Sequence, residues 1–405
     1  MTQAPSFQLP LHMRRDHFDP VPELATIREE EGVRQVTTVF GSQATLVARY
    51  ADVRHVLGDA ETFSNSMAFR TLPGDTRSPE EIEQARAGNL LGFDPPDHTR
   101  LRRMLTPEFT VRRMNRLEPR IVEIVDQHLD AMEAAGAPAD LVPSFALPIP
   151  SLVICELLGV PYADRDGFQR RTARQLDLSI PVAERLPLQK EGRAYMESLV
   201  AAARADPGDD MLGMLVREHG SDDRDGDLSN DELVGIANLL LIAGHETTSN
   251  MLGLGTLALL RHPDQLALVR DDPDAAAPAV EELMRWLSIV HSGVLRTATR
   301  DTEIAGKPVK KGDLVVCALA TANRDGELVT DPQRLDVTRG APGHLAFGHG
   351  VHHCLGAPLA RMEMRIAFPA LLRRFPGLAL AVPFEEVPFR SFHFIYGLQA
   401  LPVTW

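Results

Sequence analysis

The chain has 405 residues, of which 44% are hydrophobic and 24% charged, a composition typical of a globular protein with a large core. Its formal net charge of −14 argues against binding to nucleic acid. Its three cysteines are too few for a disulfide framework, the first residues lack the pattern of a secretory signal, and no apolar run could span a bilayer. We therefore expect a cytoplasmic protein without a membrane segment.

In chain order, the predicted elements are short strands toward both ends and helices between them. Runs rich in β-branched residues predict strands at 35–40, 44–48, 302–304, 314–318 and 398–403. Apolar residues at helical spacing predict a helix over 117–132, and Pro278 begins another that extends through Trp286. No linker, repeat or low-complexity tract interrupts the sequence. We expect one domain over residues 1–405, mainly α with small β sheets.

A long buried helix is predicted in the second half of the chain. Ser229 and Glu232 have the spacing of a capping box, and the helix then continues to about Leu260, just before His262-Pro263. At about 1.5 Å per residue it would span roughly 45 Å, enough to cross the protein. Its middle is apolar on nearly all sides, which predicts that it is buried.

That helix contains one unusual segment, at residues 243–248. The small residues Ala243 and Gly244 would leave a notch where a ligand could touch the backbone. Glu246 and Thr247 follow, an acid and a hydroxyl that are costly to bury without a purpose. A threonine can also hydrogen-bond to a carbonyl one turn earlier, so a simple helix irregularity is the alternative interpretation.

Two segments carry concentrated charge. Residues 206–232 contain ten Asp or Glu against two Arg, a local net charge of −8, which we interpret as a solvated face. Residues 100–120 contain seven Arg against two Glu, a local net charge of +5.

Cys354 lies in a glycine-rich loop, residues 347–358, directly before an amphipathic helix. The glycines let backbone N–H groups turn toward the sulfur, and the helix N-terminus and nearby histidines favour the thiolate. A buried cysteine in a turn is one alternative. A zinc site with His349, His352 and His353 is another, although structural zinc sites usually contain paired cysteines. The remaining cysteines lie in apolar runs and are predicted to be buried: Cys155 and Cys317.

Taken together and in this order, these patterns resemble one family, the cytochromes P450, which are haem-thiolate monooxygenases. The family's loop pattern F-x-x-G-x-[HR]-x-C-x-G is matched at Phe347, Gly350, His352, Cys354 and Gly356. Its helix pattern [AG]-G-x-[DE]-T is matched at Ala243, Gly244, Glu246 and Thr247.

A third match is the family's E-x-x-R pair, at Glu282 and Arg285. By itself such an i, i+3 pair is common on helix surfaces. The segment 332–335 resembles the one that contributes a third charged residue, here Arg334, although Leu335 stands where the family usually has Phe.

The resemblance implies the cytochrome P450 fold, with haem b held between the long helix and the helix after Cys354, and with Cys354 as the iron ligand. Propionate contacts are implied for His98, Arg102, Arg296 and His352. Such residues suit two carboxylates that enter a site of low dielectric constant. Further haem contacts are implied for Ala243, Gly244, Phe347, Gly348 and Gly356.

The resemblance also implies the activity. One oxygen atom from O₂ would be inserted into a hydrophobic small molecule, with electrons from a separate ferredoxin and ferredoxin reductase. Thr247 and Glu246 would be the catalytic pair that organises water and delivers protons. The alternatives are a haem-thiolate peroxygenase or coupling enzyme, which the intact acid–threonine pair disfavours, and a non-catalytic haem-binding protein. We expect a monomer that contacts neither nucleic acid nor a membrane.

Two surfaces follow from position within the family. A basic face for an acidic ferredoxin is expected from Arg102, Arg103, Arg112, Arg113, Arg116, Arg361 and Arg365. An apolar substrate pocket is expected from Met67, Phe69, Leu90, Leu91, Leu240, Ala243, residues 290–295, Phe392, Phe394 and Ile395.

Overall fold

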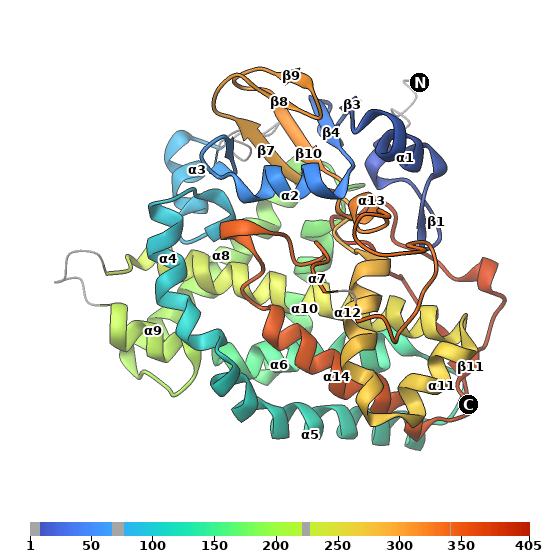
Figure 1. Cartoon of the computed structure of the whole chain (residues 1–405). Helices are drawn as coiled ribbons and strands as arrows, with labels where there is room; N and C mark the ends of the chain where they lie inside the picture. Colours follow the sequence, from blue (N-terminus) through green and yellow to red (C-terminus); the bar gives the residue numbers. More distant parts are fainter. Residues whose placement is uncertain (1–8, 67–76, 221–226, 341) are drawn as a thin grey trace, which may run out of the picture.

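The structure is a computed structural model that describes residues 9–66, 77–220, 227–340 and 342–405 (Figure 1). Helices make up most of this part of the chain, and the largest sheet lies at one side, at the top of Figure 1. The helices are α1 (Pro22–Thr26), α2 (Tyr50–Gly58), α3 (Pro79–Arg86), α4 (Asp97–Leu105), α5 (Val111–Ala135), α6 (Pro148–Leu158), α7 (Arg165–Leu176), α8 (Val182–Ala205), α9 (Met211–His219), α10 (Asn230–Leu260), α11 (Pro263–Asp271), α12 (Ala276–Leu287), α13 (Leu319–Ala322) and α14 (Ala357–Arg374). The strands are β1 (Arg15–Asp16), β2 (Asp19–Pro20), β3 (Val33–Thr37), β4 (Gln43–Val47), β5 (Phe63–Ser64), β6 (Ala139–Asp140), β7 (Val294–Ala298), β8 (Thr302–Ile304), β9 (Lys307–Val309), β10 (Leu314–Cys317), β11 (Ala379–Leu380) and β12 (Pro402–Thr404).

The largest sheet has the strand order β3-β4-β10-β7-β5. β10 is parallel to β4 and antiparallel to β7, so that Val316 pairs with Leu46 on one side and with Leu295 on the other. Four of the five predicted strands correspond to β3, β4, β8 and β10. β8 belongs to a separate sheet with β9. The largest sheet joins β3, β4 and β5 from the first part of the chain with β7 and β10 from the later part, in line with the clustering of the predicted strands.

Two differences from the predicted strands have a physical cause. β7 was not predicted, because it is formed by pairing with β10 and β5 and contains the buried charge of Arg296. The prediction of a strand over 398–403 is wrong in its first part, since Leu398 forms only an isolated bridge with Phe389 and β12 begins at Pro402. Both differences depend on long-range pairing rather than on local propensity.

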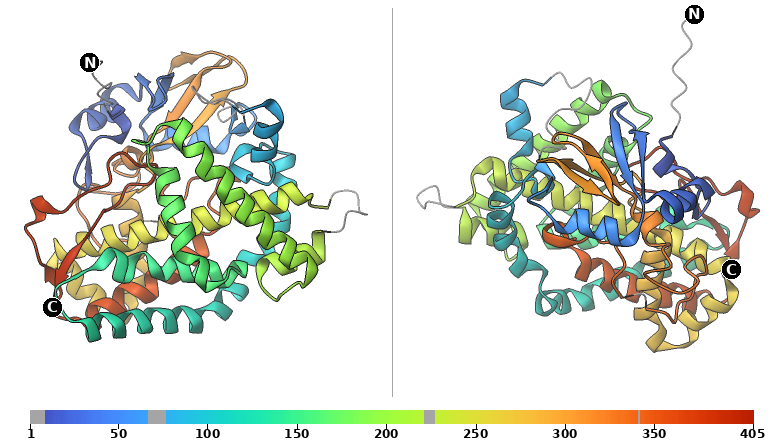
Figure 2. Two further views of the ribbon diagram at one scale, coloured as in Figure 1. Left: turned by 180° about the vertical axis from the view of Figure 1, so that it is seen from behind. Right: turned by 45° about the horizontal axis from the view of Figure 1, so that its top comes forward.

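The predicted long helix is confirmed as α10. The Ser229 hydroxyl accepts a hydrogen bond from the Glu232 N–H at 3.2 Å, and the Glu232 carboxylate accepts one from the Ser229 N–H at 2.9 Å, which completes the capping box. α10 crosses the middle of the molecule and packs against α6, α8 and α14 (Figures 1 and 2). In the described ranges, α10 included, no helix is both long and apolar enough to cross a membrane.

Two helix boundaries differ from those predicted. α5 begins at Val111, so Pro119 lies inside the helix, with its exposed side chain on the surface. A proline there leaves one carbonyl without its helical N–H partner, and at an exposed position water can replace that partner. α12 begins at Ala276, which places Pro278 within the first turn rather than at the first residue.

Candidate functional site

The cysteine loop is closed by its own backbone. The Cys354 N–H donates to the Phe347 carbonyl at 2.9 Å, and the Gly348 N–H donates to the Leu345 carbonyl at 2.8 Å. Gly348 and Gly350 have φ angles of +73° and +72°, a region that side chains other than hydrogen disfavour. A Cβ at Gly350 would also lie 2.5 Å from the Leu57 carbonyl oxygen of α2. The glycines therefore let the loop turn and lie directly against α2.

Cys354 lies two residues before Gly356, the N-cap of α14. The residue is exposed to solvent, yet desolvation by the surrounding protein raises the pKa of its thiol. Hydrogen bonds from the Gly356 and Ala357 N–H groups and the charges of Arg102 and Arg361 act in the opposite direction. The backbone N–H groups at the start of α14 therefore act in the predicted direction, but burial outweighs them. A coordinated metal cation would reverse the balance, because a coordinating thiol loses its proton.

The nearby histidines supply no positive charge to the cysteine. Burial lowers the pKa of His349 and His353, and it lowers the pKa of His352 to about 3. All three are therefore neutral near pH 7. Across the described ranges, no three His, Cys, Asp or Glu side chains are arranged to hold a metal ion, which gives the zinc alternative no support.

A group of hydrogen-bond donors lies beside the cysteine loop. The rings of His98 (α4) and His352 lie 4.2 Å apart between centroids, and none of their four buried ring nitrogens has a hydrogen-bond partner. Arg296, only 2% exposed on β7, is close enough to His352 to lower its pKa. The Asp94 carboxylate nearby already accepts hydrogen bonds from the Ser64 hydroxyl and the Asn65 N–H. The group therefore has donors to spare for an added anion.

Two arginines complete this group. Arg296 donates from Nη1 to Asn65 Oδ1 and to the Leu295 carbonyl, both at 2.8 Å, and burial lowers its pKa. Burial also lowers the pKa of Arg102, which lies close enough to Cys354 for a thiolate to oppose that effect. Unpaired buried donors and cations next to a cysteine fit a haem group, whose two propionates would supply the anions.

In the 243–248 segment of α10, Thr247 forms the hydrogen bond to a carbonyl one turn earlier that a helix irregularity would involve. Thr247 Oγ1 donates to the Ala243 carbonyl at 2.7 Å, while α10 remains a continuous helix. Within this segment Ala243 is exposed, Gly244 and Thr247 are half-buried, and the other residues are buried. Gly244 differs from the prediction, since a Cβ there would lie 2.7 Å from Ile154 Cδ1 of α6. Gly244 therefore lets α10 pack closely on α6, because Ile154 occupies the space that a side chain at position 244 would need.

Glu246 is almost completely buried, with 2% of its surface exposed. Its Oε2 lies 3.6 Å from Arg390 Nη1 and accepts a hydrogen bond from Asn250 Nδ2 at 3.4 Å. Arg390 is a functional candidate that the sequence interpretation missed. The available signal was one arginine in the largely apolar and aromatic stretch 387–395, which also contains Ser391 and His393.

The Glu282–Arg285 pair is fully buried, with nitrogen–oxygen distances of 2.7 and 2.8 Å. The prediction that Arg334 is its third charged member is wrong. Arg334 contributes only its carbonyl oxygen, 3.3 Å from Arg285 Nη2, while its exposed side chain turns to Asp336. Arg339 takes the expected place, with Nε 3.4 Å from Glu282 Oε1. The backbone near the buried Leu335 directs the side chain of Arg334 outward.

The expected pocket residues are only partly described. Met67 and Phe69 lie outside the described residues. Leu90 and Leu240 are buried, and Leu91 is exposed. The others that remain half-buried, and so able to contact a ligand, are Val290, Val294, Leu295, Phe392, Phe394 and Ile395.

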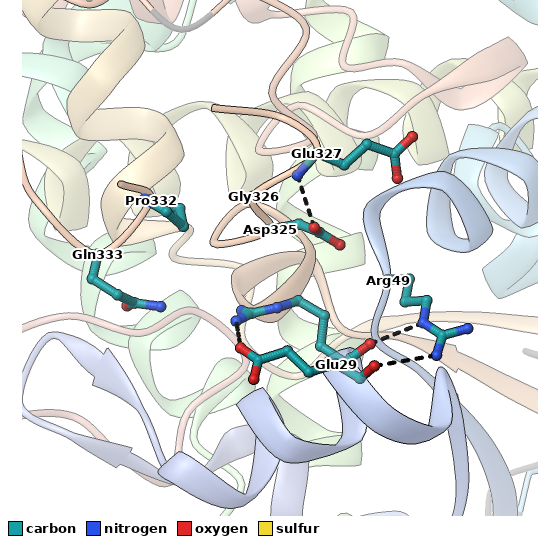
Figure 3. Close-up of a pocket in the computed structure, with 8 residues that line it drawn as sticks. Glu29, Arg49, Asp325, Gly326, Glu327, Pro332 and Gln333 are labelled. Atoms are coloured by element: carbon teal, nitrogen blue, oxygen red, sulfur yellow. Dashed lines mark hydrogen bonds and ion pairs between the residues drawn. The ribbon is translucent and has the colours of Figure 1, made fainter. Parts of the chain in front are cut away.

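A separate polar pocket of about 570 Å³ lies between the π-helical turn Ile27–Glu31 and the 325–333 loop (Figure 3). Arg28 Nη2 donates to Glu29 Oε1 at 2.8 Å, and Arg49 Nε donates to the Arg28 carbonyl at 2.9 Å. Glu29 thus neutralises Arg28 there, whereas Arg49 binds backbone oxygen. None of the predicted site residues lines this pocket.

Known proteins resemble the chain along its whole length. The family model for cytochrome P450 matches residues 277–380. Cytochrome P450 FAS1 of Rhodococcoides fascians is 50% identical over 404 residues, covering 99% of this chain and 100% of the relative. Vitamin D(3) 25-hydroxylase of Pseudonocardia autotrophica is 43% identical over 388 residues, 95% of this chain and 94% of that protein.

Solved structures give the same result. The crystal structure of CYP105P1 in complex with filipin I superposes with a TM-score of 0.90 at 43% identity, covering 97% of each chain. The family model and Cytochrome P450 FAS1 name the same family, and the relatives and the structural neighbour match this chain over nearly its whole length. The chain belongs to the cytochrome P450 family and is a monooxygenase that uses haem b.

Proposed function

We propose that the chain inserts one oxygen atom from O₂ into a hydrophobic small molecule, with Cys354 as the iron ligand and with electrons from a separate ferredoxin and its reductase. One observation carries this proposal. Near Cys354 lie the unpartnered ring nitrogens of His98 and His352 and the cations Arg102 and Arg296, while the Asp94 carboxylate beside them already accepts hydrogen bonds from Ser64 and Asn65. The two histidines and the two arginines would hold the propionates of a haem, and Cys354 would supply the thiolate ligand.

The bound haem supplies the redox chemistry of oxygen activation. The residues of the chain then have separate tasks. The cationic side chains of Arg102 and Arg296 would bind the negatively charged propionates. Each ring nitrogen of His98 and His352 can donate or accept one further hydrogen bond. The Thr247 hydroxyl and the Glu246 carboxylate, adjacent on α10, hold and move protons.

The proposed substrate is apolar. The half-buried candidates Val290, Val294 and Leu295 and the aromatic and aliphatic side chains of the C-terminal turn offer almost entirely hydrocarbon contacts. One relative is named for hydroxylation of vitamin D(3), and one structural neighbour is a complex with filipin I. These names support a hydroxylation or epoxidation of a hydrophobic molecule.

The ferredoxin is proposed to bind a smaller basic face than the sequence predicted. Arg113 is 3.0 Å from Glu108 and Arg361 is 2.6 Å from Glu281, so both already have counterions. Exposed arginines for which the described chain provides no acidic partner are Arg103, Arg112, Arg116 and Arg365. We propose these four as the main contacts for an acidic partner.

The absorption spectrum of the reduced, CO-bound protein tests the proposal. A thiolate ligand to haem iron would shift the Soret band of the CO complex strongly to the red, and we expect this band in the wild type and its loss in C354H. The variant C155S provides the control, since Cys155 is buried in α6. An ordinary haem spectrum of the wild type would contradict the assignment of Cys354.

A further inference from the structure

A buried carboxylate on α10 requires a charge partner, and few groups face it. Glu246 is 2% exposed, and a carboxylate buried to this extent is strongly disfavoured unless a charge or hydrogen-bond donor compensates it. The polar groups around its two oxygens come from three places: His245 Nε2 at 3.8 Å, Asn250 Nδ2 at 3.4 Å and Arg390 Nη1 at 3.6 Å.

The histidines in this environment are not cations at neutral pH. Burial lowers the pKa of His245, whose Nε2 has no hydrogen-bond partner. His393 also interacts with Glu246, but burial again is the largest effect and lowers its pKa. Asn250 is neutral. Within the described chain, Arg390 therefore remains as the cation that can balance Glu246.

Arg390 reaches α10 because the C-terminal turn that carries it is fixed against that helix. We call residues 389–398 the C-terminal hairpin. The Arg390 N–H donates to the Gly397 carbonyl at 2.8 Å, and Phe389 and Leu398 form a β-bridge at its base. A Cβ at Gly397 would lie 1.5 Å from Asn250 Oδ1, so only glycine permits this approach. Asn250 Nδ2 in turn donates to the Glu246 carbonyl at 2.6 Å.

The other side of the C-terminal hairpin is bound to the segment that follows α7. The Leu178 N–H donates to the Phe392 carbonyl and the Phe394 N–H donates to the Leu176 carbonyl, both at 3.0 Å. The C-terminal hairpin thus connects the end of α7 with the middle of α10. Arg390, with 22% of its side chain exposed, lies between the buried Glu246 and solvent.

We propose that Arg390 is the positioning residue that supplies the charge partner of Glu246 and orients it beside Thr247, and that the C-terminal hairpin fixes this pair by binding α7 and α10 together. The inference rests on the proposed function in one respect, the use of Glu246 for proton delivery. Without the Arg390 cation, the Glu246 carboxylate would be a buried charge without a partner, which disfavours its charged form.

Difference infrared spectroscopy of the haem-loaded protein over a range of pH measures this directly. We expect R390Q to gain, near pH 7, the C=O stretching band of a protonated carboxylic acid. The band should be missing from the double variant E246Q/R390Q, which identifies Glu246 as its source. R390K keeps the charge and should resemble the wild type. Glu363, whose pKa burial also raises, contributes equally to all spectra and cancels in the differences.

R374Q is the matched control, because Arg374 forms ion pairs with Asp130 at 2.6 Å and Glu133 at 3.0 Å far from α10 in sequence. Thermal unfolding gives a second measurement if R390Q is unstable: adding E246Q to R390Q should raise its Tm. The proposal is overturned if R390Q has the same carboxyl bands as R374Q, or if E246Q leaves the Tm of R390Q unchanged. Neither measurement needs substrate or O₂, so failure of the proposed reaction would appear separately, in turnover assays.

Discussion

At the scale of single residues, the site is defined by side chains whose hydrogen-bonding capacity exceeds what the protein itself provides. His98 and His352 each have two buried ring nitrogens without partners, and an unsatisfied buried polar atom costs about 1–3 kcal/mol. Arg285 shows the opposite case, since it pairs with Glu282 and also donates to the carbonyls of Asn323 and Pro332. Satisfied buried charges stabilise the fold, whereas the unsatisfied donors indicate where a ligand completes it.

His98 gives the prediction at this scale. Replacement by leucine removes a buried donor beside the proposed propionates while it keeps most of the side-chain volume. Loss of one hydrogen bond to a charged group is worth about 1.5 kcal/mol, so H98L should release haem roughly 10-fold faster. Transfer of haem to excess apomyoglobin, followed by absorbance, measures this rate. H55L, which alters an exposed histidine of α2, is the control; equal rates for H98L and H55L would exclude His98 as a haem contact.

At the scale of elements, the regular helices could be predicted and the connections between them could not. The capping box of α10 is a local pattern, so Ser229 and Glu232 were sufficient to place its start. Arg339 and Arg390 reach Glu282 and Glu246 through backbone turns far away in the sequence. The cysteine loop was predictable as a motif. The raised pKa of its thiol was not, since burial depends on tertiary packing that the motif does not specify.

The link between α12 and α14 gives a prediction of pH dependence. Glu281 on α12 accepts hydrogen bonds from His344 Nε2 at 3.1 Å and from Arg361 of α14 at 2.6 Å. Burial opposes ionisation, but these partners outweigh it and lower the pKa of Glu281 from 4.5 to about 2. Because the folded-state pKa is the lower one, the stabilisation is complete above pH 4.5 and is lost as the pH falls toward 2.

The variant E281Q tests this link. We expect it to lower the free energy of unfolding by roughly 2–3 kcal/mol near neutral pH, after allowance for partial exposure. The difference from the wild type should shrink between pH 4.5 and 2, because the wild-type carboxylate becomes protonated there. Urea denaturation at a series of pH values measures it. E123Q, at an exposed ion pair with Arg120, should change stability by less than about 1 kcal/mol. A pH-independent difference would show that Glu281 acts only through packing.

At the scale of the whole molecule, charge is distributed unevenly around an acidic average. The net charge is −14, yet the start of α5 and the helix α14 carry arginines that the described chain leaves without acidic partners. α4, α5 and α14 lie together toward the viewer in Figure 1, whereas α7 lies behind them (Figures 1 and 2). An acidic protein that retains a basic face can attract a partner more acidic than itself in one orientation.

Reversal of one charge on this face tests whether electrons arrive there. R112E should slow reduction by an acidic ferredoxin several-fold at low salt. Arg112 is exposed and forms no ion pair within the described chain, so its charge is available to a partner. The difference should disappear as ionic strength rises, since screening acts over about 10 Å at 0.1 M salt. Stopped-flow reduction under CO measures the rate. R170E on α7 changes the net charge equally but on the back of the molecule, and should leave the rate unchanged. If R170E and R112E slow reduction to the same extent, total charge rather than a docking face controls the encounter.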